Sequence, residues 1–234
     1  MRRIAGILLA LALLACAVSA GAAGFVFPLT GWDMDGNETE IAVPDNCRLI
    51  ILDCWQPWCT HCIRGMANLN RMYERYRDRG LLVIGVYSYT DADLYTENLT
   101  AKQIAEREGV TYPVLRVPQE TIDAWAPIGY PTVWMTDRDG NTVPFTHEEK
   151  VAMISSYTRA LWQLQLEEAG YKEDDPEYAA YMETYCSDEA LTKDAESFIA
   201  ECEAKWNEGA LTGGSGYEPW AGIIERRLGI GPAQ

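Results

Sequence analysis

The sequence predicts an α/β fold with an N-terminal β-hairpin, a central insertion and a C-terminal helical extension. Two nearly unbroken apolar runs, residues 49–55 and 81–87, indicate strands that are covered on both faces. Between them, from Cys59 to Gly80, apolar residues recur at steps of three and four, which predicts a helix. A strand, a helix and a strand in this order form a right-handed parallel crossover unit. Because 48% of the 234 residues are apolar, the chain can bury a sizeable core.

The other elements follow in chain order. Residues 25–43 hold two short apolar segments about the turn-forming Asp35-Gly36-Asn37, which predicts the hairpin. The polar segment 91–109 is expected to be a loop followed by a helix over 101–108, with Thr100 as its N-cap. The remaining predictions are a strand over 112–117, a short helix over 119–126, two strands over 132–135 and 142–145 joined by a hairpin turn at 138–141, a long amphipathic helix over 147–169, and a mostly helical segment over 170–234 with a Gly-rich linker at 209–216.

The first residues predict export from the cytoplasm. The apolar run 4–14 follows two arginines; it is too short to span a bilayer and fits the core of a signal peptide. Residues 18–20 fit ordinary signal cleavage, which would leave a chain that begins at Gly21. Leu13-Leu14-Ala15-Cys16 instead resembles the lipobox of bacterial lipoproteins. We prefer the lipobox, because it follows the apolar run directly and accounts for Cys16.

Lipid on Cys16 predicts attachment to the extracytoplasmic face of a bacterial membrane, since two or three acyl chains hold a protein stably on a bilayer. The chain is then divided into a lipoprotein signal peptide over 1–15, a tether over 16–24, a folded domain over 25–169 and the helical extension over 170–234. The net charge of −16 would repel a phosphate backbone, so we expect no nucleic acid partner.

Two of the seven cysteines, Cys59 and Cys62, carry the predicted chemistry. They lie where the strand over 49–55 passes into a helix. A cysteine at a helix N-terminus faces unpaired backbone amides, which stabilise its thiolate and lower its pKa. Cys62 lies one turn further on and can close a disulfide, so an attacking thiolate and its resolving partner are supplied together. The alternatives are a structural disulfide and half of a zinc site; no second ligand pair is present, and we expect neither metal nor cofactor.

This Trp-Cys-x-x-Cys motif, within this order of elements, resembles the thioredoxin superfamily, and within it the exported TlpA/ResA-like thiol-disulfide oxidoreductases. The resemblance covers about residues 25–169, where Tyr130-Pro131-Thr132 matches the family's cis-proline loop and 138–141 its following hairpin. It implies a thioredoxin fold and a cis peptide bond before Pro131 that offers its backbone to an extended substrate. Trp58 and Tyr130 are expected beside that substrate.

Asp53 and His61 favour opposite directions of electron flow. A carboxylate inside an apolar strand is unfavourable unless it has a task or a partner. The resemblance implies that Asp53 takes the proton from Cys62 when a mixed disulfide resolves. His61, which lies with Thr60 between the cysteines, would stabilise the Cys59 thiolate and so favour an oxidant. The structural alternatives are an Asp53 that accepts a backbone hydrogen bond and a His61 that caps the helix or faces solvent.

The other cysteines have mostly structural interpretations. Cys54 is expected to be a buried, inert thiol. Cys47 cannot pair with it, because the intervening strand separates them by about 23 Å, whereas the α-carbons of a disulfide lie about 4.4–6.8 Å apart. Cys186 and Cys202 can form a disulfide only if the chain bends between them, because a continuous helix would place them about 24 Å apart.

The leading prediction is therefore an extracytoplasmic enzyme that reduces disulfides of protein substrates and takes its electrons from a membrane donor of the thiol-disulfide type. The resemblance extends this to the maturation of c-type cytochromes. The alternatives are an oxidase that donates disulfides, and a copper metallochaperone, which would use Cys-x-x-x-Cys and a distant histidine where this chain offers only His147. A thiol peroxidase needs a Pro- and Thr-bearing loop before its reactive cysteine, and no such loop precedes Cys59. A binding module based on the extension is the remaining class.

Overall fold

The computed structural model describes residues 24–88, 99–127, 129–202, 210–212 and 217–230. The strands are β1 (Leu29–Trp32), β2 (Glu38–Ile41), β3 (Leu49–Cys54), β4 (Leu81–Tyr87), β5 (Val114–Arg116), β6 (Thr132–Thr136) and β7 (Ala210–Thr212). The helices are α2 (Thr60–Tyr76), α3 (Ala101–Arg107), α4 (Gln119–Trp125), α5 (His147–Glu168), α6 (Pro176–Tyr185), α7 (Asp188–Cys202) and α8 (Tyr217–Leu228), with a 3₁₀ turn at Arg77–Arg79. Among these helices, none combines the length and the apolar character needed to cross a bilayer.

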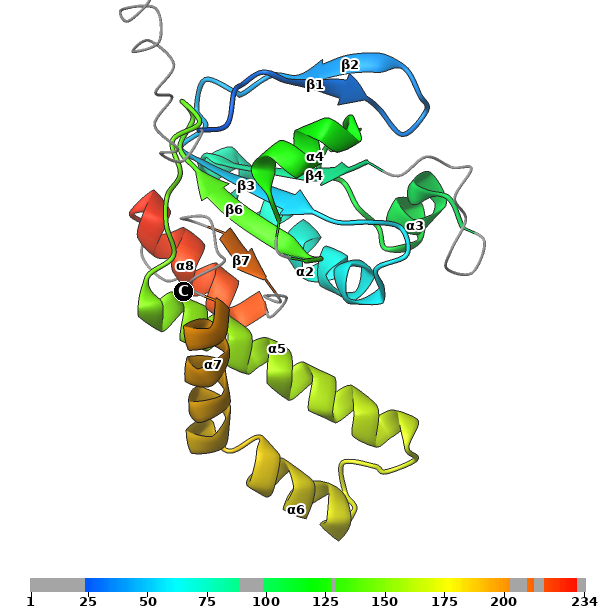
Figure 1. The fold of residues 1–234 in the computed structure, drawn as a ribbon, viewed down its shortest axis with the longest axis vertical. Coiled ribbons are helices and arrows are strands. Elements are labelled where there is room, and N and C mark those ends of the chain that lie inside the picture. The colour runs from blue at the N-terminus through cyan, green and yellow to red at the C-terminus, as the bar shows by residue number, and fades with distance from the viewer. Residues whose placement is uncertain (1–23, 89–98, 128, 203–209, 213–216, 231–234) are drawn as a thin grey trace, which may run out of the picture.

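The described strands form one mixed sheet in the order β2-β1-β5-β4-β3-β6-β7 (Figure 1). Strands β3, β4 and β5 are parallel, and β6 runs antiparallel to β3. The hairpin of β1 and β2 joins the sheet where Trp32 pairs with Arg116 of β5. The predicted α/β class, with a parallel crossover unit of β3, α2 and β4 and an N-terminal hairpin, is confirmed.

Local sequence signals set several boundaries. All six residues of β3 and all seven of β4 are buried, as their apolar runs predict. Helix α2 is followed by the 3₁₀ turn and then by Gly80, whose φ of 104° is a conformation that glycine adopts without strain. Thr100 and Thr146 begin α3 and α5 with complete capping boxes, which satisfy the otherwise unpaired amides of the first turn.

The second strand of the predicted 132–145 hairpin does not form. A single bridge joins Thr136 to Thr142, and the Val143 amide donates to the Met135 carbonyl at 2.8 Å. Pro144 then has no N–H to continue the ladder. Phe145 turns into the core instead, with its ring centroid 5.7 Å from that of Trp220.

Strand β7 takes the remaining edge of β6. It lies inside the segment that was predicted to be a Gly-rich linker, 209–216, and it pairs antiparallel with β6 from Thr132↔Thr212 to Trp134↔Ala210. The prediction of a plain linker is therefore wrong for three of its residues. This strand brings the C-terminal part of the chain next to the residue that follows Pro131.

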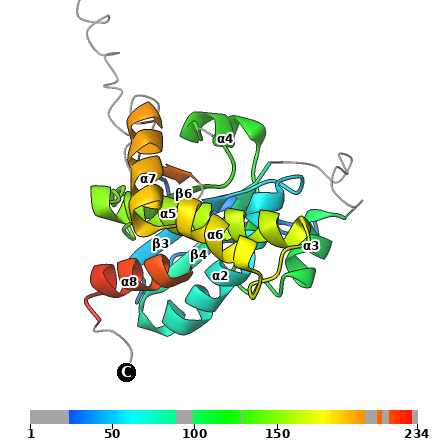
Figure 2. The same ribbon diagram turned by 90° about the horizontal axis from the view of Figure 1, so that it is seen from below.

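Helices cover the sheet on both faces (Figures 1 and 2). On one face, α2, α3, α5 and α8 pack over an apolar cluster that also takes side chains from α7. On the other face, Ile122 of α4 packs with Phe25 and Trp134 in a second cluster. The extension contributes to the first cluster with Ala195, Ile199, Trp220, Ile223, Ile224 and Leu228. Part of the segment 170–234 thus belongs to the same core as the redox cysteines, although the division of the chain at residue 169 stays a prediction.

Candidate functional site

Cys59 and Cys62 lie at the N-terminus of α2 and form a disulfide, with their α-carbons 5.3 Å apart. Cys59 is the N-cap residue, and its Sγ accepts a hydrogen bond from the Cys62 amide at 3.1 Å. After reduction the same amide and the positive end of the helix would stabilise a Cys59 thiolate. Both residues belong to the apolar cluster beneath α2, and little of either is exposed, 5% of Cys59 and 2% of Cys62.

The loop before β6 contacts this motif. The Tyr130–Pro131 peptide bond is cis, as the resemblance implies. The Tyr130 ring meets the Trp58 ring edge-on, with centroids 5.5 Å apart, and 39% of Trp58 is exposed. Trp58 and the cis-proline loop together form an accessible surface beside the disulfide, which is where an extended polypeptide would lie.

Gln56 holds this surface in place, and the sequence did not single it out. Its Nε2 donates to the Tyr130 hydroxyl at 3.2 Å and to Ser88 Oγ at 2.9 Å. The side chain is buried, and these bonds replace the lost hydration of Nε2, whereas Oε1 has no partner among the described residues. The available signal was a polar residue directly after a buried strand, but its partners are far away in the sequence.

Asp53 lies in β3 beside Gly85 of β4 and Val133 of β6. Side chains alternate between the two faces of a strand, and Asp53 lies an even number of residues from Leu49 and Ile51. It therefore points to the same face as they do, the face that carries α2. Only 2% of it is exposed, and among the described residues its Oδ2 has no hydrogen-bond partner. Burial raises the pKa of this carboxyl to about 7. Asp53 is thus poised to gain or lose a proton near neutral pH.

Two more buried polar side chains, Trp55 and Tyr112, lie near Asp53. A carbon added to Gly85 would lie 3.3 Å from Trp55 Nε1 and 3.1 Å from Tyr112 Cε2, so both rings cover the residue that pairs with Asp53. Neither Trp55 Nε1 nor the Tyr112 hydroxyl has a partner within the described chain. Burial, and then the Asp53 charge, raises the pKa of Tyr112. Tyr112 shows no sequence signal of a role beside Asp53, because only the fold brings the two residues together.

His61 and Thr60 lie on the exposed side of the helix start. The His61 ring meets the Tyr157 ring of α5 edge-on, with centroids 5.7 Å apart. Burial, and then the positive charge of Arg64, lowers the pKa of His61 below its usual range. The lowered pKa disfavours the charged form of the His61 ring beside Cys59.

The remaining cysteines lie away from this chemistry. Cys47, Cys54 and Cys186 are buried free thiols. Burial, and then the Asp53 charge, raises the pKa of Cys54, which keeps that thiol protonated and inert. Cys186 precedes the continuous helix α7, and it forms no disulfide with Cys202. Cys16 and the signal peptide predicted over 1–15 lie outside the described residues.

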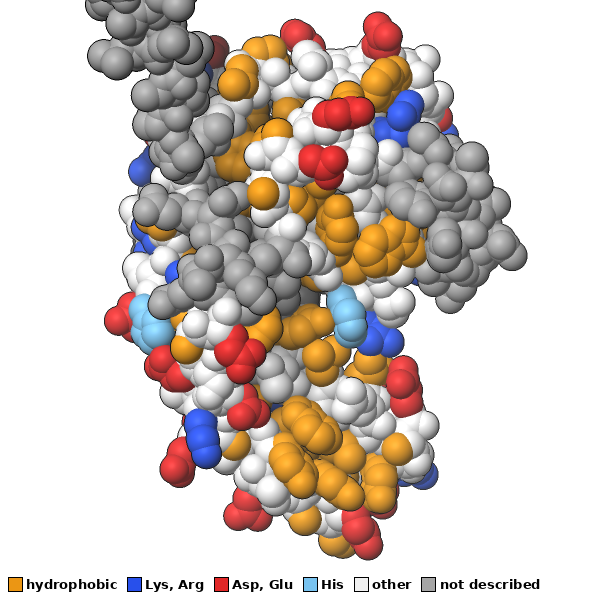
Figure 3. Space-filling model, in the orientation of Figure 1, with side chains coloured by type: hydrophobic (Ala, Val, Ile, Leu, Met, Phe, Trp, Pro, Cys, Tyr) orange, Lys and Arg blue, Asp and Glu red, His pale blue; other side chains and the backbone are white. Residues whose placement is uncertain are grey.

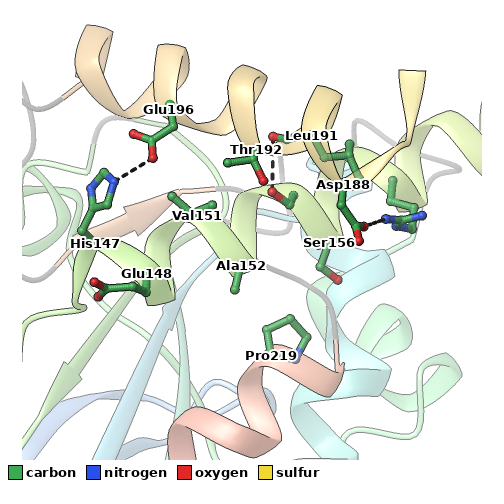
Figure 4. Close-up of a pocket in the computed structure, with 12 residues that line it drawn as sticks. His147, Glu148, Val151, Ala152, Ser156, Asp188, Leu191, Thr192, Glu196 and Pro219 are labelled. Carbon is green, nitrogen blue, oxygen red and sulfur yellow. Dashed lines mark hydrogen bonds and ion pairs between the residues drawn. The ribbon is translucent and has the colours of Figure 1, made fainter. Parts of the chain in front are cut away.

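A hollow of about 650 Å³ lies between α5 and α7, and neither Cys59 nor Cys62 is among its lining residues (Figure 4). Its polar groups pair with each other across the two helices: His147 with Glu196 at 3.0 Å, and Arg159 with Asp188 at 2.9 Å. These pairs join the helices, so size alone does not make this hollow the reactive site.

A cysteine pair of this geometry can pass between dithiol and disulfide, which is the chemistry of thiol-disulfide exchange. In comparisons with known proteins, the model of the AhpC/TSA family matches residues 22–144, more than half of the chain. The chain belongs to the AhpC/TSA family. Membership in this thioredoxin-superfamily family agrees with the observed β3-α2-β4 unit, the disulfide and the cis-proline loop. The predicted resemblance and thioredoxin fold are confirmed.

This AhpC/TSA family chain is similar to a Geobacillus kaustophilus protein named thiol-disulfide oxidoreductase ResA, with 27% identity over 53% of this chain and 67% of that one. A protein of the same name from Bacillus thuringiensis is 26% identical over 47% of this chain and 61% of its own length. The chain thus spans less than two thirds of the second relative. A crystal structure of the thioredoxin domain of a thiol-disulfide oxidoreductase from Bacteroides vulgatus matches with 22% identity and a TM-score of 0.40, over 51% of this chain and 84% of that one.

Proposed function

We propose that this protein is a lipid-anchored thiol-disulfide oxidoreductase that reduces disulfides of client polypeptides outside the cytoplasm. The observation that carries the proposal is the position of Cys59, whose Sγ lies at the N-terminus of α2 and accepts the Cys62 amide, beside the exposed Trp58 and the cis-proline loop. The names of the ResA relatives support the same chemistry.

The cycle needs only the two cysteines and a proton acceptor. The Cys59 thiolate attacks one sulfur of a client disulfide; one S–S bond forms, the client bond breaks, and a client thiolate leaves. Cys62 then loses its proton to Asp53 and attacks Cys59 Sγ, which releases the second client thiolate and closes the enzyme disulfide. A membrane dithiol donor reduces that disulfide again and becomes oxidised itself.

Two pKa values favour the reducing direction. The pKa of Asp53, raised by burial to about 7, lets it accept the Cys62 proton and release it again near neutral pH. Burial lowers the pKa of His61, which disfavours the positive charge that would favour an oxidant. Maturation of c-type cytochromes stays part of the proposal on the family resemblance alone.

Variants of the cysteines test the exchange step. Cys59→Ser should abolish dithiothreitol-dependent reduction of insulin, because no attacking thiolate remains. Cys62→Ser should trap a mixed disulfide with insulin, visible on a non-reducing gel. Cys186→Ala, which changes a buried free thiol of the extension, is the matched control and should keep activity. If Cys59→Ser and Cys62→Ser both turned over normally, the proposed site would be wrong.

The anchor is supported by the apolar run 4–14 and the lipobox that ends at Cys16. Mass spectrometry of the protein made in a bacterial host with lipoprotein processing should find a chain that begins at Cys16 and carries acyl mass. The Cys16→Ser variant should be lost from the membrane fraction, because it lacks the cysteine that would carry the anchoring acyl chains. A mature wild-type chain that begins at Gly21 would contradict the anchor and leave the exchange chemistry untouched.

A further inference from the structure

A second cleft adjoins the redox site, and the C-terminal extension builds one of its walls. It has a volume of about 300 Å³ and is lined by Tyr130, Pro131, Ile154, Tyr157, Asp194 and Phe198, together with Thr158. These residues come from the cis-proline loop, α5 and α7. We call it the extension cleft. In Figure 3, hydrophobic side chains gather over α5 where it meets the sheet domain.

Ring contacts connect this cleft to both sides of Cys59. Tyr130 contacts Trp58, the residue before Cys59, with ring centroids 5.5 Å apart. Tyr157 contacts His61, two residues after Cys59, with centroids 5.7 Å apart. The extension cleft is therefore continuous with the surface on which a client must lie to meet Cys59.

The chemistry of the lining selects the occupant. Ile154 is buried, Tyr130 and Tyr157 are half-buried, and Phe198 is 39% exposed, so most of the described wall is apolar or aromatic. Asp194 is the one charged residue in this lining, and the whole chain has a net charge of −16. An acidic side chain is therefore disfavoured. A volume of about 300 Å³ lies at the lower end of ligand pockets, which suits one large side chain better than a cofactor.

We propose that the extension cleft binds a large apolar side chain of the client, two positions from the client's reacting cysteine. This inference rests on the proposed function and names its substrate class: polypeptides with an aromatic or long aliphatic residue beside the disulfide. In an extended segment, side chains two positions apart project on the same side, about 7 Å from each other. When the client sulfur lies at Cys59, the side chain two positions away therefore projects towards the cleft. Its burial there adds binding free energy and takes no part in the exchange reaction.

Symmetrical peptide dimers test this selection, because attack on either sulfur gives the same products. Each dimer holds two identical peptides joined by one disulfide, with Phe or with Ser two positions from the cysteine on both sides. The reduced full-length protein should react with the Phe dimer about tenfold faster than with the Ser dimer, as expected for an apolar pocket. The measured quantity is the second-order rate constant in stopped-flow fluorescence.

Variants locate the source of the preference. Phe198→Ala opens the wall and Thr158→Trp fills the cleft, so both should bring the Phe-to-Ser rate ratio close to one. Tyr185→Ala removes an exposed aromatic ring elsewhere in the extension and should keep the ratio. One variant removes bulk at an exposed position and the other adds bulk at a partly exposed one, so a folding failure of either leaves the other as the test.

The outcomes separate this inference from the proposed function. Equal rates for both dimers in the wild type would overturn the extension cleft as a client site, while exchange itself would stand. A preference that persists in a folded Phe198→Ala or Thr158→Trp variant would also overturn it. Failure to reduce either dimer would instead overturn the proposed function.

Discussion

At Asp53, β3 places a carboxyl group in the core, where only 2% of the residue is exposed. Burial raises the pKa from its ordinary value of 3.8 to about 7. Between these two values the folded protein holds a proton that the unfolded chain has released, so stability falls as pH rises. This contribution is fully present below about pH 4 and is lost as pH rises through about 7.

Asp53→Asn should therefore increase stability at pH 8 by a few kcal/mol, roughly 1.4 per unit of pKa difference, because the amide cannot ionise. The gain should disappear near pH 4. Denaturant unfolding of the oxidised protein at both pH values measures it, with the exposed Asp139→Asn as control. The same variant should slow the resolution of mixed disulfides at pH 7. A variant less stable than the wild type at pH 8 would contradict the raised pKa.

Single residues were predictable where their chemistry is local. Cys59 and Cys62 were found from their spacing at a strand-to-helix junction, and Asp53 from its charge within an apolar run. Gln56 and Tyr112 were missed, because their roles come from contacts between distant segments. The Gln56 bond to Tyr130, for example, joins residues 74 positions apart.

At the scale of elements, helix starts with a Thr cap and buried strands with continuous apolar runs were predicted closely. Strand β7 was not, since Ala210–Thr212 is too short to show a period and its pairing depends on a free edge of β6. That edge is free because Pro144 interrupts the strand that was expected over 142–145. One proline thus accounts for both errors.

Helix α8 is fixed to α5 by ion pairs at Glu149, which is 5% exposed. Arg226 and Arg227 of α8 lie 3.2 and 2.7 Å from its carboxylate oxygens. Burial alone would raise the pKa of Glu149, but the hydrogen bond from the Thr146 amide and those from Arg227 and Arg226 outweigh it and hold the pKa below 4.5. Its contribution to stability is therefore present above about pH 4.5 and is lost as pH falls through the lowered pKa.

Glu149→Gln should destabilise the protein by about 2–3 kcal/mol at pH 7, because two arginines lose the negative charge of their partner at a buried site. Glu168→Gln, which removes the exposed pair with Arg64 at 3.5 Å, should change stability by less than about 0.5 kcal/mol. Thermal unfolding at pH 7 compares the two variants. Equal effects would show that α8 is held by apolar packing alone.

In the whole molecule, the extension is joined to the redox domain by a shared core, an added strand and the ion pairs of α8. Residues from α7 and α8 pack in the same cluster as Cys59 and Cys62. The family match ends at residue 144, before α5, so α7 and α8 lie outside the matched segment. The redox pair and its supporting core therefore have to be studied in the full chain.

The reduction potential of the Cys59–Cys62 pair distinguishes a reductant from an oxidant. Thioredoxin, a reductant, has a potential of about −270 mV, and a periplasmic oxidase about −120 mV. The lowered pKa of His61 and a buried Asp53 that accepts protons near neutral pH predict a value between about −270 and about −200 mV at pH 7. Equilibration with glutathione or dithiothreitol buffers, followed by thiol alkylation, measures it. A potential close to about −120 mV would contradict the account and make the protein a donor of disulfides.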